Sequence, residues 1–242
     1  MNNNMEENKQ ITVIVPVHKF DEEVKALLTR AVESVDTEYC DLLFVGPNDV
    51  LLSIKDSYKD ATFVKNEDTD VFNQINKAAF QCVTPYFTVL EFDDVLLPNW
   101  KTTLVNEVQG NTVTIPLNEF VEDGKFRAFG NEIAWDAAFI HEDGEIGYVT
   151  EEELKLFNNF NVTGSIIKTE DFISLGSLKP EFKIFAWYEF LMRATRAGKV
   201  IYVVPRVCYS HTVLRKGSYM VEMESAINKE EISELLNKVL GD

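Results

Sequence analysis

The sequence predicts an α/β fold: a mostly parallel, twisted sheet flanked by helices. Between residues 11 and 110, short β-branched apolar runs alternate four times with segments whose apolar residues recur at helical spacing. Hydrophobic residues make up 45% of the 242 positions, with 17 Phe and 8 Tyr, which is enough for a packed core. Beyond residue 110, the Asp-Gly pairs at 123–124 and 143–144 indicate hairpins. A smaller half that contains β-hairpins is therefore expected to follow.

The first half is predicted from its apolar runs and its helix caps. The expected strands lie at 11–15, 42–45, 62–64 and 86–90. The expected helices start at the acids 21–23, at Asn48 or Asp49, at Thr69 or Asp70, and at Pro98 as a first-turn proline. Alternation of this kind places helices on both faces of a parallel sheet.

The second half has a less regular pattern. We expect a strand at 112–115, a capping box from Thr150 to Glu153, a helix over 184–197 stopped by Gly198, and a strand over 200–204 ended by Pro205. A basic loop should follow from Arg206 to Tyr219, and a last helix from Asn228. The expected organisation is a disordered tail at 1–10, two halves at 11–110 and 111–220, and a C-terminal helix at 221–242, in a single domain.

Charge and cysteine content exclude several classes of function. The net charge of −17 argues against general nucleic-acid binding and against docking on anionic membranes. The three cysteines lack CxxC spacing, which favours free thiols in a reducing compartment. The first ten residues are polar and do not form a signal peptide, and no window has the length of a membrane span. A cytoplasmic location is therefore expected.

The stretch that organises the functional prediction is the acidic turn at 91–94. A buried strand delivers Glu91, Asp93 and Asp94 in quick succession, and ligands of open α/β sheets collect at such strand ends. Three carboxylates placed together repel one another unless a cation joins them. We therefore expect a divalent-metal site that holds a phosphorylated ligand, with a solvated acidic turn as the alternative. The sequence has no GxGxxG or GxxxxGK[ST] motif, which argues against a Rossmann site and a P-loop.

The order of these motifs resembles a known family. The segments ITVIVPVHKF, DLLFVGPND, FNQINKAAF and YFTVLEFDD are similar to the nucleotide-binding half of family-2 glycosyltransferases with the GT-A fold. The segments TGSIIKTEDFISLG and WYEFLMRATRAGKVIYVVPRVCYSH resemble the acceptor and catalytic half. The resemblance spans residues 11–220. It implies a GT-A-like fold, a nucleotide-sugar-binding half at 11–110 and an acceptor half at 111–220.

The resemblance also implies a reaction and a set of site residues. A sugar would pass from a nucleotide diphosphate donor, foremost a UDP-sugar, to the hydroxyl of an unknown acceptor, with inversion and with Mn²⁺ or Mg²⁺. The implied metal ligands are Glu91, Asp93 and His211. The implied donor-binding residues are Pro16, Val17, His18, Pro47, Asn76, Glu91, Phe92, Arg215 and Lys216. Trp135 and Phe139 are candidates for an acceptor platform, with core packing as the alternative.

One departure from the family pattern puts catalysis in question. The Glu-Asp pair that carries the family's general base aligns with Ala186-Trp187. Either Glu189, Asp94 or an acid in a loop takes the role of base, or the chain is a catalytically degenerate binding or structural protein within an assembly. For His18, His211, Arg215, Lys216 and Glu189, ordinary structural or exposed roles compete, including an ion pair between Glu189 and Arg193.

Overall fold

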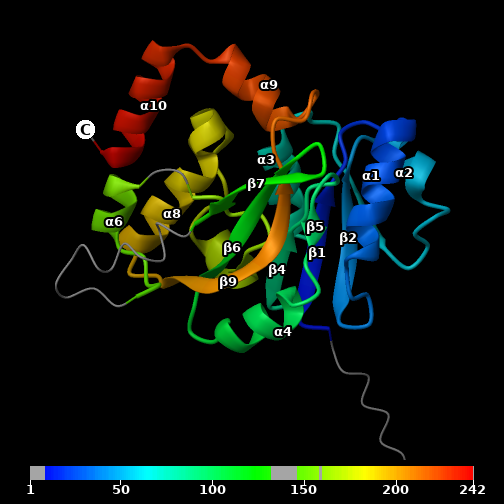
Figure 1. Ribbon diagram of the computed structural model, residues 1–242, viewed down its shortest axis with the longest axis horizontal. Helices are drawn as coiled ribbons and strands as arrows, with labels where there is room; N and C mark the ends of the chain where they lie inside the picture. Colours follow the sequence, from blue (N-terminus) through cyan, green and yellow to red (C-terminus); the bar gives the residue numbers. More distant parts are fainter. Residues whose placement is uncertain (1–8, 132–145, 158–159, 242) are drawn as a thin grey trace, which may run out of the picture.

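The computed structural model describes residues 9–131, 146–157 and 160–241. Its centre is a nine-stranded sheet in the order β3-β2-β1-β4-β8-β6-β9-β5, with β7 paired to β6 (Figure 1). Helices cover the sheet, so the α/β architecture expected from the sequence is confirmed.

The four strands of the first half form one parallel block. They are β1 (Ile11–Pro16), β2 (Cys40–Gly46), β3 (Thr62–Lys65) and β4 (Tyr86–Val89). Adjacent strands in the order β3-β2-β1-β4 are all parallel, so their carboxyl ends lie at the same edge of the sheet. That edge is where a ligand site is expected in a sheet of this kind.

The helices of the first half are α1 (Glu22–Glu33), α2 (Asn48–Ile54) and α3 (Val71–Ala79). Asp21 caps α1, and Asp70 caps α3 by accepting from two backbone N–H groups. The expected cap of α2 is wrong: Pro47 holds the N-cap position, and no side chain caps the helix. Because Pro47 has a fixed φ and an extended ψ, it turns the chain from β2 directly into α2.

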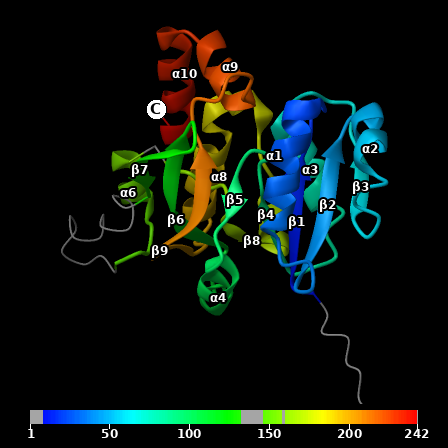
Figure 2. The same cartoon turned by 45° about the vertical axis from the view of Figure 1, so that its right-hand side comes forward.

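Side chains that alternate along β1 divide the core into two apolar layers. Ile11, Val13 and Val15 pack against α1 and α2. Ile14 faces α3 and the aromatic residues of the second half. Figure 2 shows α1 on one face of the β1–β2 block and α3 on the other. The parallel block is thus buried on both faces, as its near-continuous apolar runs predict.

A short connection follows the acidic turn. It comprises β5 (Val95–Leu96), α4 (Trp100–Leu104) and a 3₁₀ turn, η1 (Val105–Glu107). Asn99 is the N-cap of α4, so Pro98 lies ahead of the helix and not in its first turn. Trp100 anchors this segment, because its Nε1 donates to the carbonyl of Gly164 at 2.6 Å.

The second half adds a hairpin to the sheet. Strands β6 (Val113–Glu122) and β7 (Lys125–Gly130) are joined at Asp123-Gly124, where both residues have positive φ, so this hairpin is confirmed. The second Asp-Gly pair and the proposed platform residues Trp135 and Phe139 lie outside the described residues.

The elements between the hairpin and β9 bring α8 against the sheet. They are α6 (Glu151–Leu156), β8 (Ile166–Lys168), α7 (Thr169–Ser174), the 3₁₀ segment η3 (Pro180–Phe185) and α8 (Ala186–Arg196). The capping box at Thr150 and Glu153 is confirmed. The helix expected from residue 184 starts two residues later, because Phe185 is its N-cap and the residues before it form a 3₁₀ segment with a positive φ of 51° at Lys183.

The strand expected to end at Pro205 does not end there. Instead, β9 runs over Ile201–Thr212. Val204 pairs with Pro116 and Val207 with the next residue, Leu117, so Pro205 and Arg206 form a bulge. A bulge is a position where a strand tolerates proline, which has no N–H to donate. The extension carries Tyr209, His211 and Thr212 to the acidic turn.

Two helices close the described chain: α9 (Tyr219–Ala226) and α10 (Lys229–Leu240). Asn228 caps α10, as expected, and Leu235 and Val239 are its buried residues. The expected C-terminal helix at 221–242 is two helices, and α9 was not expected as a separate one, since it has no fully buried residue and no clear apolar periodicity. Among the described residues, no helix is long and apolar enough to span a membrane. Cys40, Cys82 and Cys208 are free thiols.

Candidate functional site

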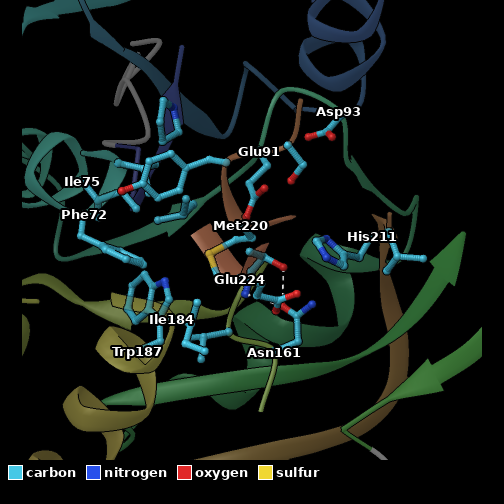
Figure 3. Close-up of a pocket in the computed structure, with 18 of the residues that line it drawn as sticks. Phe72, Ile75, Glu91, Asp93, Asn161, Ile184, Trp187, His211, Met220 and Glu224 are labelled. Carbon is cyan, nitrogen blue, oxygen red and sulfur yellow. Dashed lines mark hydrogen bonds between the residues drawn. The ribbon is translucent and has the colours of Figure 1, made fainter. Parts of the chain in front are cut away.

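A cavity of about 400 Å³ lies beyond the carboxyl ends of β1 and β4. Pro16 and His18 line it from β1, Glu91 and Asp93 from the acidic turn, and Arg215 from the segment after β9. Helices α3, α8 and α9 provide an apolar wall, and Figure 3 shows Glu91, Met220 and Glu224 near the middle of the cavity. The acidic turn is therefore part of a real cavity, at the position expected from the sheet topology.

Asp94 is buried inside the protein and does not line the cavity. Its Oδ2 accepts from the hydroxyl of Tyr209 at 2.7 Å and contacts Nδ1 of His211 at 2.8 Å. Its Oδ1 accepts from the backbone N–H of Thr212 at 2.7 Å. These contacts join the acidic turn to β9. The prediction that Asp94 is a catalytic base is corrected: this carboxylate is a structural link.

Asp93 faces the cavity but is paired. The Nε of Arg215 donates to its Oδ2 at 2.5 Å, and both side chains are largely buried. The guanidinium also lies over the ring of Phe92, 5.0 Å from its centroid. The carbonyl of Asp93 accepts from Arg30 and from the Thr212 hydroxyl. The sequence prediction that Phe92 and Arg215 belong to one site is supported by this geometry.

Glu91 faces the cavity and is half-buried. Burial, followed by repulsion from Asp94, raises the pKa of Glu91 to about 8, while His211 and Arg215 act in the opposite direction. Near neutral pH this carboxyl is therefore largely protonated. It can take up or release a proton close to physiological pH, as a general acid or base must.

The two histidines of the site carry different charges. Burial lowers the pKa of His18, and the nearby Lys19 and Arg215 lower it further, so this ring is neutral at pH 7. Burial also opposes the charged form of His211, but the adjacent Asp94 carboxylate outweighs it and raises the pKa of His211 to about 9. His211 is therefore a cation paired with Asp94.

The residues present do not fit the expected divalent metal. Within the described ranges, no three His, Cys, Asp or Glu side chains are grouped so that they hold an ion. Arg215 occupies Oδ2 of Asp93, and His211 directs its Nδ1 at Asp94. Glu91, Asp93 and His211 all line the cavity, but they do not converge on one point as a metal centre requires.

Glu189 also has a different place from the one expected. It does not line the cavity, and it accepts from Arg193 at 2.9 and 2.7 Å and from Lys179 at 2.8 Å. Burial alone would raise its pKa, but the hydrogen bonds from Arg193 and Lys179 prevail and lower it. A low-pKa carboxylate held by two cations is a poor base. The alternative interpretation, an ion pair with Arg193, is correct.

The remaining expected site residues divide into two groups. Pro16, His18, Glu91, Phe92, Asp93, His211 and Arg215 line the cavity. Val17, Pro47, Asn76 and Lys216 do not.

Each of these four residues has another role or position. The side chain of Asn76 exchanges two hydrogen bonds with the backbone of Leu178 and so fixes the turn before η3. Val17 is fully buried, Pro47 caps α2, and Lys216 is exposed. Direct donor binding by these four residues stays a prediction, and the lining of the cavity does not support it.

Sequence reasoning missed most of the apolar wall. Phe72 and Ile75 come from α3, Trp187 from α8, and Met220 and Glu224 from α9 (Figure 3). Phe72 and Ile75 belong to the helix expected from Thr69 or Asp70, and no sequence pattern assigned them to the site. Trp187 was noted for standing where a catalytic acid belongs, and it does point into the site. Helix α9 had no sequence signal that could have identified its contribution.

Solved structures with a similar fold are known. The chain aligns with TarS 1–349 of S. aureus at 14% identity and a TM-score of 0.63, covering 96% of this chain and 72% of that one. A complex of TarS with UDP-GlcNAc aligns at 16% identity and TM-score 0.64, over 95% of this chain and 65% of that one. A complex with UDP aligns at 15% and 0.59, over 96% and 72%.

These alignments establish the fold and nothing finer. No family model matches the sequence, and no curated protein matches it. At the identities found, the likeness shows a shared α/β fold but not membership of family 2. The shared fold agrees with the fold that the resemblance in the sequence implies.

Proposed function

We propose that the chain is a glycosyltransferase that takes a sugar from a nucleotide diphosphate donor, foremost a UDP-sugar. The observation that carries the proposal is the cavity at the carboxyl ends of β1 and β4, lined by His18, Glu91, Asp93 and Arg215 in a GT-A-like sheet. The similar TarS structures hold UDP-GlcNAc and UDP, which favours the same ligand class here.

The cavity contains groups suited to such a transfer. An acceptor hydroxyl attacks the anomeric carbon, the bond from that carbon to the phosphate oxygen breaks, and the nucleotide diphosphate leaves with the electron pair. The hydroxyl proton passes to a carboxylate. Among the described carboxylates that line the cavity, Asp93 is paired with Arg215, and Glu91 can accept the proton only in its ionised fraction, because its pKa is raised to about 8. Glu224 is therefore the first candidate and Glu91 the second. The family resemblance implies inversion at the anomeric carbon. It also implies a divalent metal, but the described side chains expected to bind that metal do not form a metal site, so the proposed reaction includes none.

The neutral ring of His18 and the mixed charge of the site are consistent with a bound nucleotide. His18 packs against Phe92, with ring centroids 5.5 Å apart, so the ends of β1 and β4 form one surface. Arg215 extends that surface with a guanidinium, which binds phosphate oxygens well. The proposed location of the chain remains the cytoplasm, where nucleotide sugars are made available to an enzyme of this kind.

A second function is supported by one specific observation. Trp187 lines the cavity where the family's acid is expected, and Glu189 is tied to Arg193 and Lys179. A cavity that binds a nucleotide sugar without turning it over, in a protein that serves an assembly, is consistent with that substitution. The two functions share the binding step and differ in the transfer step.

A two-stage experiment distinguishes them. The first stage is a thermal-shift screen against UDP, GDP and TDP sugars, in which one nucleotide class should raise Tm. The second stage incubates the stabilising donor, labelled in the sugar, with the protein and measures release of free nucleotide. The enzyme is supported if the wild type releases free nucleotide and if Glu91→Gln, Glu224→Gln or both abolish that release. Stabilisation without release supports the binding protein, and no stabilisation by any donor refutes both.

A further inference from the structure

We infer that Arg215 takes the place of a divalent metal at the diphosphate, so that donor binding in this chain needs no Mn²⁺ or Mg²⁺. The inference rests on the proposed function, because it concerns how a nucleotide diphosphate is held. It arises from the disagreement between the expected metal ligands and the contacts that these residues make.

The guanidinium of Arg215 lies at the acidic turn. Arg215 lines the cavity, and its Nε reaches Oδ2 of Asp93, the central residue of the expected metal motif. Its planar group lies 5.0 Å from the centroid of Phe92. A fixed cation at the acidic turn is what a metal would supply. Here a side chain of the protein supplies it.

Arg215 keeps N–H donors that its protein partners do not use. A guanidinium has five N–H donors. The Nε–H goes to Asp93, and Nη1 makes a long contact of 3.2 Å with the carbonyl of Lys216. Within the described chain, no hydrogen bond uses Nη2. Donors are thus left for phosphate oxygens, which guanidinium groups bind in a two-pronged geometry.

The carboxylates of Asp93 and Asp94 are already occupied by partners within the protein. All three contacts of Asp94 go to β9, so this residue has no oxygen directed into the cavity. Asp93 is paired with Arg215, and the described residues contain no group of three metal ligands. To bind an ion at Asp93, the protein would have to break a pair whose side chains are only 12% and 5% exposed. Separating a buried pair is unfavourable.

The segment that precedes Arg215 is anchored to the acidic turn. The hydroxyl of Thr212 donates to the carbonyl of Asp93 at 2.7 Å, so the end of β9 is fixed to the same turn. Only two residues separate Thr212 from Arg215. A short, anchored connection of this kind keeps the guanidinium near the turn before the donor arrives, which lowers the cost of ordering it on binding.

The test is equilibrium binding of UDP, measured by calorimetry in EDTA and again in Mn²⁺. We expect the wild-type dissociation constant to differ by less than about twofold between the two conditions, because a change of that size is smaller than the contribution of a single hydrogen bond. Arg215→Ala should weaken UDP binding by about 10- to 100-fold in EDTA, since hydrogen bonds to charged groups contribute at this level. Arg215→Lys, which keeps the charge but not the fork, should lose less.

Arg206→Ala is the matched control, because Arg206 is exposed on β9 and contacts its neighbour's carbonyl, away from the cavity. Circular dichroism verifies folding of each variant, and the wild-type comparison of EDTA with Mn²⁺ needs no variant at all. Binding of UDP that disappears in EDTA and returns with Mn²⁺ would overturn the inference and leave the proposed function intact. If UDP and the other nucleotide diphosphates bind under neither condition, both are refuted.

Discussion

Asp94→Asn removes the charge that joins the acidic turn to β9 while it preserves the shape of the side chain. Asp94 is fully buried and serves three donors, from Tyr209, His211 and Thr212. An asparagine oxygen can still accept from the Thr212 N–H. Its NH₂ group then faces Tyr209 and His211, and a protonated His211 cannot accept a hydrogen bond. The variant therefore leaves the partly buried His211 cation without its partner.

The magnitude follows from that unpaired charge. Removing one partner of a buried ion pair lowers the free energy of unfolding by about 3–5 kcal/mol. For a chain of this size, 1 kcal/mol shifts Tm by roughly 2–4 °C, so Tm should fall by roughly 6–20 °C. The assays are urea denaturation followed by circular dichroism and a thermal scan. The histidine resonance in NMR should also show that the pKa of His211 falls from its raised value of about 9.

The matched control for this variant is Asp41→Asn. Asp41 pairs with Lys9 at 3.4 Å on the surface, with side chains 41% and 36% exposed. Exposed pairs contribute at most about 1 kcal/mol, so this variant should remain near wild type. If Asp94→Asn were as stable as Asp41→Asn, with the pKa of His211 unchanged, the description of Asp94 as the link between the turn and β9 would be wrong.

Further predictions concern the helix α8 pair, a tight glycine and the apolar wall. Because the pKa of Glu189 is lowered in the folded state, the stability that Glu189 contributes is present above pH 4.5 and is lost as the pH falls through its folded-state pKa. Glu189→Gln should flatten that part of a curve of unfolding free energy against pH, while UDP binding stays unchanged. Gly164→Ala should destabilise by about 2–5 kcal/mol in urea, since φ is +76° and the new Cβ would lie 2.2 Å from the ring of Tyr209; wild-type stability would contradict the tight contact. Trp187→Ala should enlarge the cavity and change the ranking of donor sugars in the thermal-shift screen, and an unchanged ranking would show that this wall does not contact the sugar.

Local patterns predicted the first half of the fold because its strands and helices are set by nearby residues. The apolar run at 11–15 and the cap at Asp70 each act within a few positions, and both were confirmed. Pro205 was misjudged for the opposite reason. A proline ends most strands, and only the pairing of β9 with β6, about ninety residues away in the chain, creates the bulge that accommodates it.

In the site, too, contacts between residues close in sequence were predictable, and contacts between residues far apart in sequence were not. The sequence identified Glu91, Asp93 and Asp94 as one acidic turn, with Glu91 and Asp93 as metal ligands and Asp94 as a candidate base. The structure separates them through partners more than 100 positions away: Arg215 for Asp93, and Tyr209 and His211 for Asp94. Conversely, the pair of Glu189 with Arg193 spans one helical turn, which is why the sequence could suggest it as an alternative.

The most direct test of the central claim is a crystal structure of the protein with UDP, grown without a divalent metal. The account predicts the nucleotide in the cavity beyond β1 and β4, with the diphosphate within hydrogen-bonding distance of the Arg215 guanidinium and the nucleoside near His18 and Phe92. A nucleotide bound elsewhere on the protein, or a cavity that stays empty at saturating UDP, would contradict it.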